Sequence, residues 1–263
     1  MRKYLALFGY ELKTIVRDPI NLYMCLFPIV MLVLAAYVFP MLVEPMDLLR
    51  GAMLKAAMLL LIVAILVFGS FFLAAMATFL LLEQKDEHTL HTIAVTPVGT
   101  SGYLKFKMGY IYLMAVLGTI LVLLGTKLIA GEKYVVLGTS LFENISVWHI
   151  VAFALVNELF TLELGLMQAA FARNKVEGFA LIKGTGILAL VPVLMVLETF
   201  QGKLQYVLGV FPNFWAIRGM LVRLMPVDFG ADLSFGWYVA VGAVYNFLLL
   251  AAAYRFFLKK AQY

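Results

Sequence analysis

The chain has 263 residues, of which 64% are hydrophobic and 13% charged, and its mean hydropathy is +0.99. A soluble domain contains about 45–50% apolar and about 25% charged residues, so this composition excludes a water-soluble globule of this size. The formal net charge is +5. The basic residues lie at the ends of apolar runs, which favours contact with lipid headgroups and gives no reason to expect a nucleic acid partner.

The N-terminal segment, residues 1–19, precedes the first long apolar run. Leu5, Phe8 and Leu12 share one face of a helix, and charged residues occupy the rest of its surface. This pattern predicts an amphipathic helix that lies in the membrane interface. The Asp18-Pro19 pair is expected to end it, because proline disfavours helix at the preceding residue.

Six apolar runs follow, and each is long enough to cross a bilayer, which takes about 20 residues. The expected spans are residues 21–43, 56–81, 108–130, 148–171, 179–200 and 236–258. The runs are continuous rather than alternating, which favours helices over a transmembrane barrel. We therefore expect an all-α integral membrane protein whose residues 1–263 form a single transmembrane domain.

The distribution of lysine and arginine predicts the orientation. With the N-terminus inside the cell, the cytoplasmic segments hold 13 of the 20 basic residues and the outer segments hold seven. Positive residues accumulate on the cytoplasmic side of membrane proteins, so both termini are expected to be cytoplasmic.

Five polar side chains occur within the fourth span. They are Asn157, Glu158, Thr161, Glu163 and Gln168. Charged residues within a span usually face the bundle interior or a cavity. The spacing of Glu158, Thr161 and Gln168 places them on one helix face, whereas Glu163 points elsewhere. Lys183 in the fifth span could meet Glu163 or extend to the membrane interface. Two interpretations stay open: the polar stripe lines a substrate path, or its hydrogen bonds only hold the helices together.

Residues 203–226 are the other unusual segment. They are apolar, but Pro212-Asn213 interrupts them and Arg218 and Arg223 add charge. Each half is too short to cross a bilayer. The segment is expected to form two short helices that re-enter the outer leaflet and pack against protein. An amphipathic surface loop is the alternative.

Several kinds of chemistry have no sequence support. The chain has no G-x-x-x-x-G-K-[ST] motif, so we do not expect it to bind ATP through a P-loop. His88 and His91 have a spacing that could serve a metal, but they lie in a polar segment and are expected to be solvated. We expect no catalytic residue, no metal and no cofactor in this chain.

Three segments carry a recognisable order of motifs. Residues 11–19 read ELKTIVRDP, residues 83–97 read EQKDEHTLHTIAVTP, and residues 212–218 read PNFWAIR. Together they resemble the permease subunits of type 2 ABC exporters, whose fold is also called type V. The resemblance covers nearly the whole chain, and within the family it points to the drug-export branch, which includes permeases for fluoroquinolones.

The resemblance implies roles for residues in each segment. An elbow before the first span would contain Arg17, Asp18 and Pro19. A cytoplasmic coupling helix within residues 83–105 would contact the ATPase through Glu83, Asp86, Glu87, Thr89, Leu90, Ile93, Thr96 and Pro97. The re-entrant segment before the last span would depend on Pro212, Asn213, Trp215 and Arg218.

The same resemblance implies an ATP-driven exporter in the plasma membrane of a bacterium or archaeon. Two copies of a separate ABC ATPase would bind ATP and magnesium, and a second permease chain would complete a homodimer or heterodimer. The expected outer loops, residues 44–51 and 131–147, are short, which favours a small amphipathic or drug-like cargo over a polypeptide. The alternatives are an ion-coupled secondary transporter that uses Glu158 and Glu163, and a non-transporting immunity or sensor subunit.

Overall fold

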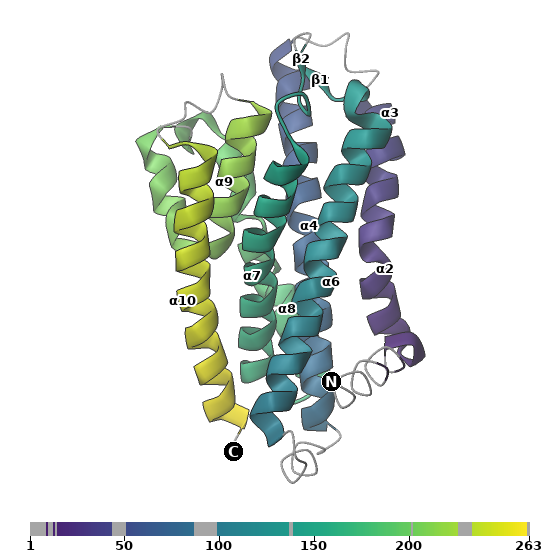
Figure 1. The fold of residues 1–263 in the computed structure, drawn as a ribbon, viewed down its shortest axis with the longest axis vertical. Helices are drawn as coiled ribbons and strands as arrows, with labels where there is room; N and C mark the ends of the chain where they lie inside the picture. The colour runs from purple at the N-terminus through teal and green to yellow at the C-terminus, as the bar shows by residue number, and fades with distance from the viewer. Residues whose placement is uncertain are drawn as a thin grey trace.

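The structure is a computed structural model that describes residues 9, 13, 15–43, 51–86, 99–136, 139–200, 202–225 and 233–261. In these ranges the chain is almost entirely helical, and six helices are long and apolar enough to cross a membrane (Figure 1). The expected all-α membrane fold with six spans is therefore confirmed.

The first three long helices come from the N-terminal half. They are α2 (Pro19–Val33), which continues through a π-helical turn η1 (Leu34–Val38) into α3 (Phe39–Val43), then α4 (Gly51–Asp86) and α6 (Gly99–Ala130). Asp18 caps α2, because its Oδ1 accepts hydrogen bonds from the backbone nitrogens of Ile20 (2.9 Å) and Asn21 (3.4 Å). The helix therefore begins at the Asp18-Pro19 pair that the sequence singled out.

The outer end between the third and fourth spans contains a short hairpin. The turn η3 (Gly131–Lys133) leads into β1 (Val135–Val136), which pairs antiparallel with β2 (Thr139–Ser140). Tyr134 is buried beside it and donates a hydrogen bond to the carbonyl of Ala35 in the π-helical turn (2.6 Å). Burial raises the pKa of Tyr134 above its usual value. This contact fixes the hairpin on η1, which continues α2.

The C-terminal half contributes the remaining long helices and the short ones. These are α7 (Val147–Phe171), α8 (Lys175–Ala189), the 3-10 helices η4 (Val191–Val196), η5 (Glu198–Phe200) and η6 (Lys203–Val210), then α9 (Pro212–Leu224) and α10 (Phe235–Ala261). The expected fifth span thus changes from α-helix to 3-10 helix near Leu190. Residues 203–226 contain the expected pair of short helices, η6 and α9, whose depth in the membrane stays a prediction.

Two helices are longer than the sequence suggested. Helix α4 has 36 residues and α6 has 32, which correspond to about 54 Å and 48 Å at 1.5 Å per residue. The hydrocarbon core of a bilayer is about 30 Å thick. Residues 99–105, which we expected in the coupling segment, form the first turns of α6, and residues 87–98 lie outside the described residues.

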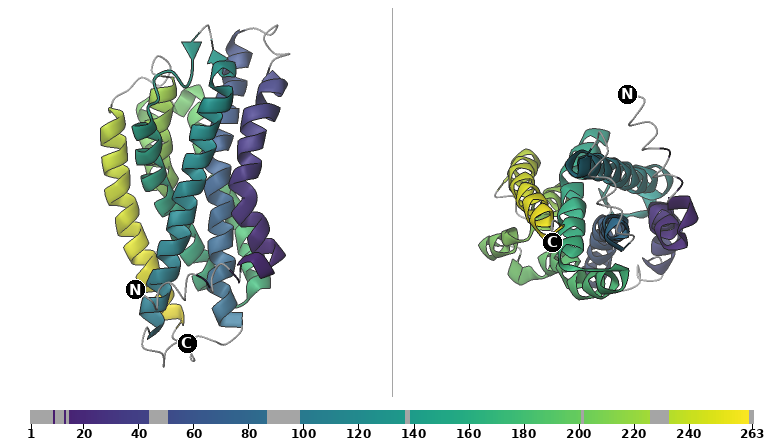
Figure 2. Two further views of the ribbon diagram at one scale, coloured as in Figure 1. Left: turned by 45° about the vertical axis from the view of Figure 1, so that its right-hand side comes forward. Right: turned by 90° about the horizontal axis from the view of Figure 1, so that it is seen from below.

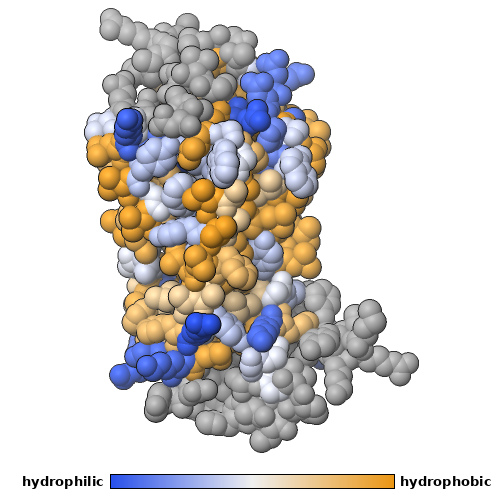
Figure 3. Space-filling view, turned by 60° about the vertical axis from the view of Figure 1, so that its left-hand side comes forward, coloured by the Kyte–Doolittle hydropathy of each residue, from blue (hydrophilic) through white to orange (hydrophobic). Residues whose placement is uncertain are grey.

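Helix α7 occupies the middle of the bundle. It packs against α4, α6, α8, α9 and α10, and Figure 2 shows it surrounded by these helices. Helix α2 lies at one edge against α4 and α6, and α10 lies at the opposite edge against α7 and α9. A space-filling view shows hydrophobic side chains over the middle of one face and hydrophilic ones near its two ends (Figure 3). The polar residues of the fourth span therefore lie in the centre of the molecule.

Candidate functional site

Glu158 on the central helix is fully buried and joins three helices. Its Oε1 accepts hydrogen bonds from Ser70 Oγ on α4 (2.7 Å), Thr119 Oγ1 on α6 (2.6 Å) and Asn157 Nδ2 (3.1 Å). Its Oε2 lies 2.6 Å from Thr161 Oγ1. Every donor belongs to an uncharged side chain, so the carboxyl group is a centre of neutral hydrogen bonds.

The number of protons that these hydroxyl and amide groups can donate indicates whether the Glu158 carboxyl group is protonated. Asn157 Nδ2 also donates to Ser70 Oγ (2.7 Å), so the Ser70 hydroxyl proton is available to Glu158. Thr161 Oγ1 lies near two acceptors, Glu158 Oε2 and the Ser70 carbonyl (3.1 Å), but a hydroxyl has only one proton. The hydroxyls of Ser70 and Thr161 and both oxygens of Glu158 are satisfied if Oε2 is protonated and donates to Thr161, which then donates to the Ser70 carbonyl.

A second polar layer lies on the same face of α7, closer to α8. Gln168 Nε2 donates to Thr185 Oγ1 on α8 (2.6 Å), and Gln168 Oε1 accepts a hydrogen bond from Thr78 on α4. Between the layers Gly165 lets the helices approach, because a Cβ there would lie 2.7 Å from the Cβ of Ala77. The arrangement supports interhelical hydrogen bonding. A substrate-path role for Asn157, Glu158, Thr161 and Gln168 stays a prediction.

Glu163 lies on a different face of α7 and has no such partners. Glu163 is 5% exposed, and neither of its carboxylate oxygens has a hydrogen-bond partner among the residues that the structure describes. The suggested contact with Lys183 is wrong. Lys183 is on the exposed face of α8, where its Nζ lies 4.5 Å from the centre of the Phe179 ring. The ammonium group thus points away from the bundle interior while its stem covers apolar surface.

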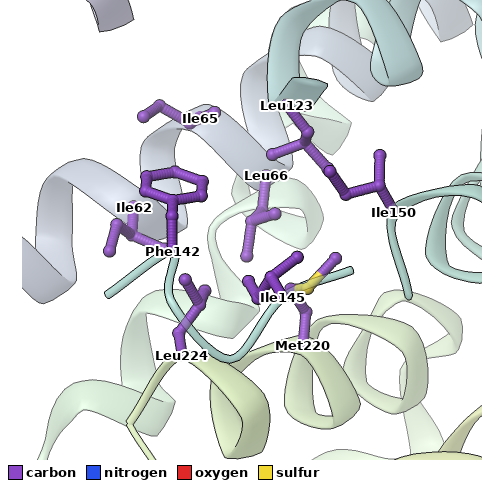
Figure 4. Close-up of a pocket in the computed structure, with 9 residues that line it drawn as sticks. All are labelled: Ile62, Ile65, Leu66, Leu123, Phe142, Ile145, Ile150, Met220 and Leu224. Carbon is purple, nitrogen blue, oxygen red and sulfur yellow. The ribbon is translucent and has the colours of Figure 1, made fainter. Parts of the chain in front are cut away.

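An apolar pocket lies where α9 meets the bundle and the segment before α7 (Figure 4). Its lining residues are Ile62, Ile65, Leu66, Leu123, Phe142, Ile145, Ile150, Met220 and Leu224. They come from α4, α6, α7, α9 and the turn after β2. The lining has no polar side chain, so this pocket could accept only an apolar group.

The expected re-entrant residues hold the short helices in place. Pro212 is the first residue of α9. Asn213 Nδ2 donates to the Leu188 carbonyl (3.2 Å), and Trp215 Nε1 donates to the Gly209 carbonyl (2.9 Å). Arg218 is completely buried. These contacts attach α9 to the end of α8 and to η6, so the segment packs against protein as expected.

Lys175, the first residue of α8, connects the elbow region with the end of α4. Its Nζ lies 3.5 Å from Asp18 Oδ2 and 3.7 Å from Glu83 Oε1. Arg17, next to Asp18, is exposed. Partly exposed ion pairs are worth about 0.2–1 kcal/mol each. We call Asp18, Glu83 and Lys175 the cytoplasmic joint, after the side of the membrane on which the basic residues predict this end of the bundle to lie.

Lys85 adds a contact at the same end of the bundle. Its Nζ donates to the carbonyls of Ala169 (2.6 Å) and Ala172 (3.2 Å), which are at the C-terminal end of α7. A cation there interacts favourably with the helix dipole. Burial, with a smaller contribution from Lys260, lowers the pKa of Lys85. The sequence analysis assigned no role to Lys85 or Lys175, because their partners come from distant segments.

The remaining coupling residues can be placed only in part. Glu83 is buried near the end of α4, and Asp86 is the last residue of that helix. The other expected coupling residues lie outside the described residues. These are Glu87, Thr89, Leu90, Ile93, Thr96 and Pro97.

The six long apolar helices, packed around buried polar residues, define a multi-pass membrane protein. The family described as "Fluoroquinolones export permease protein Rv2686c-like" matches residues 11–254, and the chain belongs to this family. The expected resemblance to drug-export permeases is therefore confirmed.

Two curated relatives support the same assignment. They are the fluoroquinolones export permease proteins MT2760 and Rv2686c, from the CDC 1551 / Oshkosh and H37Rv strains of Mycobacterium tuberculosis. Each is 27% identical over 260 residues, which cover 97% of this chain and 94% of the relative. No solved structure shows a significant match.

Proposed function

We propose that the chain is the membrane-spanning permease subunit of an ABC exporter that moves a small amphipathic, drug-like molecule out of the cell. The single observation that carries this proposal is membership of the export permease family over residues 11–254. Because the relatives are named for fluoroquinolones, a compound of that class is the first cargo to test.

The energy would come from a partner. The chain has no P-loop motif, so two copies of a separate ABC ATPase would bind ATP and magnesium and hydrolyse the nucleotide. Helix α4 leads directly into the segment that would contact this ATPase. The cytoplasmic joint links the end of α4 to α2 and α8, so a push on α4 would reach both helices. A second permease chain, identical or related, would complete the transporter.

The proposed location is the plasma membrane, with both termini in the cytoplasm. Helix α2 begins and α10 ends at the same end of the bundle (Figure 1), as six spans require. The basic residues favour the cytoplasmic side for that end.

Co-purification tests the assignment. The tagged chain, solubilised from its native membrane, is expected to retain an ABC ATPase that mass spectrometry identifies. Burial of a leucine at an interface is worth about 1.5–3 kcal/mol, so Leu90→Asp is expected to weaken this association at least tenfold. The conservative Leu90→Met variant is the matched control. If no ATPase is retained by the wild-type chain, or if Leu90→Asp retains it fully, the proposed coupling is wrong.

A further inference from the structure

Helices α7 and α10 contact each other near both of their ends. The rings of His149 and Phe235 are 4.8 Å apart near the start of the two helices, and those of Phe171 and Phe256 are 5.3 Å apart near their ends. The helices therefore run side by side in the same direction and keep one register. These two contacts show which residues of α7 and α10 lie at the same height along the parallel helices.

Two buried polar side chains are placed in this interface by the register of the helices. Val156 of α7 contacts α10 at Gly242, because a Cβ on Gly242 would lie 3.2 Å from Val156 Cγ1. Glu163 comes two turns after Val156 and therefore lies on the same face of α7. Asn246 comes one turn after Gly242 and is 0% exposed. The register places Glu163 and Asn246 within about one helical turn of each other.

Within the described residues, none of the four terminal nitrogen and oxygen atoms of Glu163 and Asn246 has a hydrogen-bond partner. Leaving such groups unsatisfied in a membrane interior is expensive. Both carboxyl oxygens of Glu158, on the same helix, have hydrogen-bond partners, which come from four side chains. The bundle can thus satisfy a buried carboxyl group, which makes the contrast with Glu163 informative.

The chemistry of the two side chains indicates what they would bind. They offer three acceptor oxygens, two of which can carry negative charge, and a single N–H₂ donor. The complementary group is a cation with several N–H donors, since charge-assisted hydrogen bonds are the strong ones. Three lysines of the described bundle have other contacts: Lys183 lies over Phe179, Lys85 binds the end of α7, and the buried Lys107 lies against Tyr103.

A membrane-borne molecule could reach this interface from the side. Helix α10 is at the edge of the bundle, and its outward face exposes Val244, Phe247 and Leu248. We propose that Glu163 and Asn246 bind the protonated amine of an amphipathic cargo in the α7–α10 interface. The apolar part of the cargo would stay against the lipid-facing side of α10. This inference rests on the proposed export function and specifies the charge of the cargo and its ligands.

The test uses two probes that differ in one charge. Norfloxacin has a protonated piperazine nitrogen at neutral pH, and in N-acetylnorfloxacin that nitrogen is an uncharged amide. Binding of each to the purified full-length chain in lipid nanodiscs is measured by equilibrium dialysis, without an ATPase. The wild-type chain is expected to prefer norfloxacin at least tenfold, which corresponds to about 1.4 kcal/mol.

Glu163→Gln and Asn246→Leu are the test variants. Glu163→Gln keeps shape but removes the charge, and it is expected to abolish the preference by weakening norfloxacin binding alone. Asn246→Leu is expected to reduce the preference by removing one oxygen ligand. Glu163→Asp should restore part of it. Glu143→Gln, in an exposed outer turn, is the matched control, and size-exclusion profiles establish that each variant is folded.

Equal binding of both probes by the wild-type chain would overturn the inference, and so would a full preference in the folded Glu163→Gln variant. The same probes are then followed as ATP-dependent transport by the chain with its ATPase. Transport of both probes without preference would leave the exporter assignment intact and refute the amine site. Amine-selective binding without any ATP-dependent transport would support the site and refute the proposed function.

Discussion

Two substitutions of Glu158 test whether its hydrogen bonds or its charge stabilise the bundle: leucine removes both, and glutamine removes only the possible charge. In Glu158→Leu, the hydroxyls of Ser70 and Thr119 and the amide of Asn157 lose their shared acceptor. Thr161 loses the carboxyl group that donates to its hydroxyl oxygen. A buried donor without a partner costs about 1–3 kcal/mol. The hydroxyls can turn to backbone carbonyls, so we expect a total loss of about 2–5 kcal/mol in the free energy of unfolding.

Glu158→Gln is the matched variant. The glutamine oxygen can accept from the three donors that face Oε1, and its amide nitrogen can donate to Thr161 Oγ1 in place of the carboxyl proton. We expect a change of less than about 1 kcal/mol, because the number of hydrogen bonds is conserved. The measurement is unfolding in mixed micelles of increasing SDS fraction, followed by tryptophan fluorescence. Equal destabilisation by both substitutions would show that the charge matters and refute the neutral network.

Three further predictions concern packing and the cytoplasmic end. Gly165→Ala is expected to cost about 1–3 kcal/mol by overpacking the α4–α7 contact, whereas Gly184→Ala, with nothing within 4 Å, should not destabilise; equal melting temperatures would contradict this. Lys85→Met is expected to cost about 0.3–2 kcal/mol and to speed amide exchange in the last turn of α7; unchanged exchange would remove the capping role. Lys175→Glu is expected to cost about 1 kcal/mol, part of which Glu83→Lys restores; a coupling energy near zero in the double-mutant cycle would exclude the ion pair.

Much of the fold follows from composition and local signals. The six apolar runs determine six spans because a bilayer accepts only segments that satisfy their own backbone. The Asp18-Pro19 pair marks the start of α2 because aspartate is a good N-cap and proline is favoured at the first helical position. The lengths of α4 and α6 were underestimated, because hydropathy detects only the part that crosses lipid, and these helices continue past it: α4 at both ends and α6 over residues 99–107.

The candidate site was predictable only as a list of residues. Helical spacing placed Glu158, Thr161 and Gln168 on one face, but Ser70 and Thr119 come from other helices and give no local signal of their role. Opposite charge suggested that Glu163 meets Lys183, yet the rotation of α8 turns that lysine outward. The contrast between a partnered and an unpartnered glutamate depends on packing, which spacing cannot show.

The central claim is that this chain exports its cargo with energy from ATP. Norfloxacin is added to the solution outside inverted membrane vesicles that contain the permease and its ATPase. Its accumulation inside the vesicles is followed with and without ATP. An ATP-driven exporter is expected to show uptake that requires ATP, is inhibited by vanadate and continues in the presence of a protonophore. Uptake that is insensitive to vanadate and is abolished by the protonophore would show an ion-coupled transporter and contradict ATP-driven export.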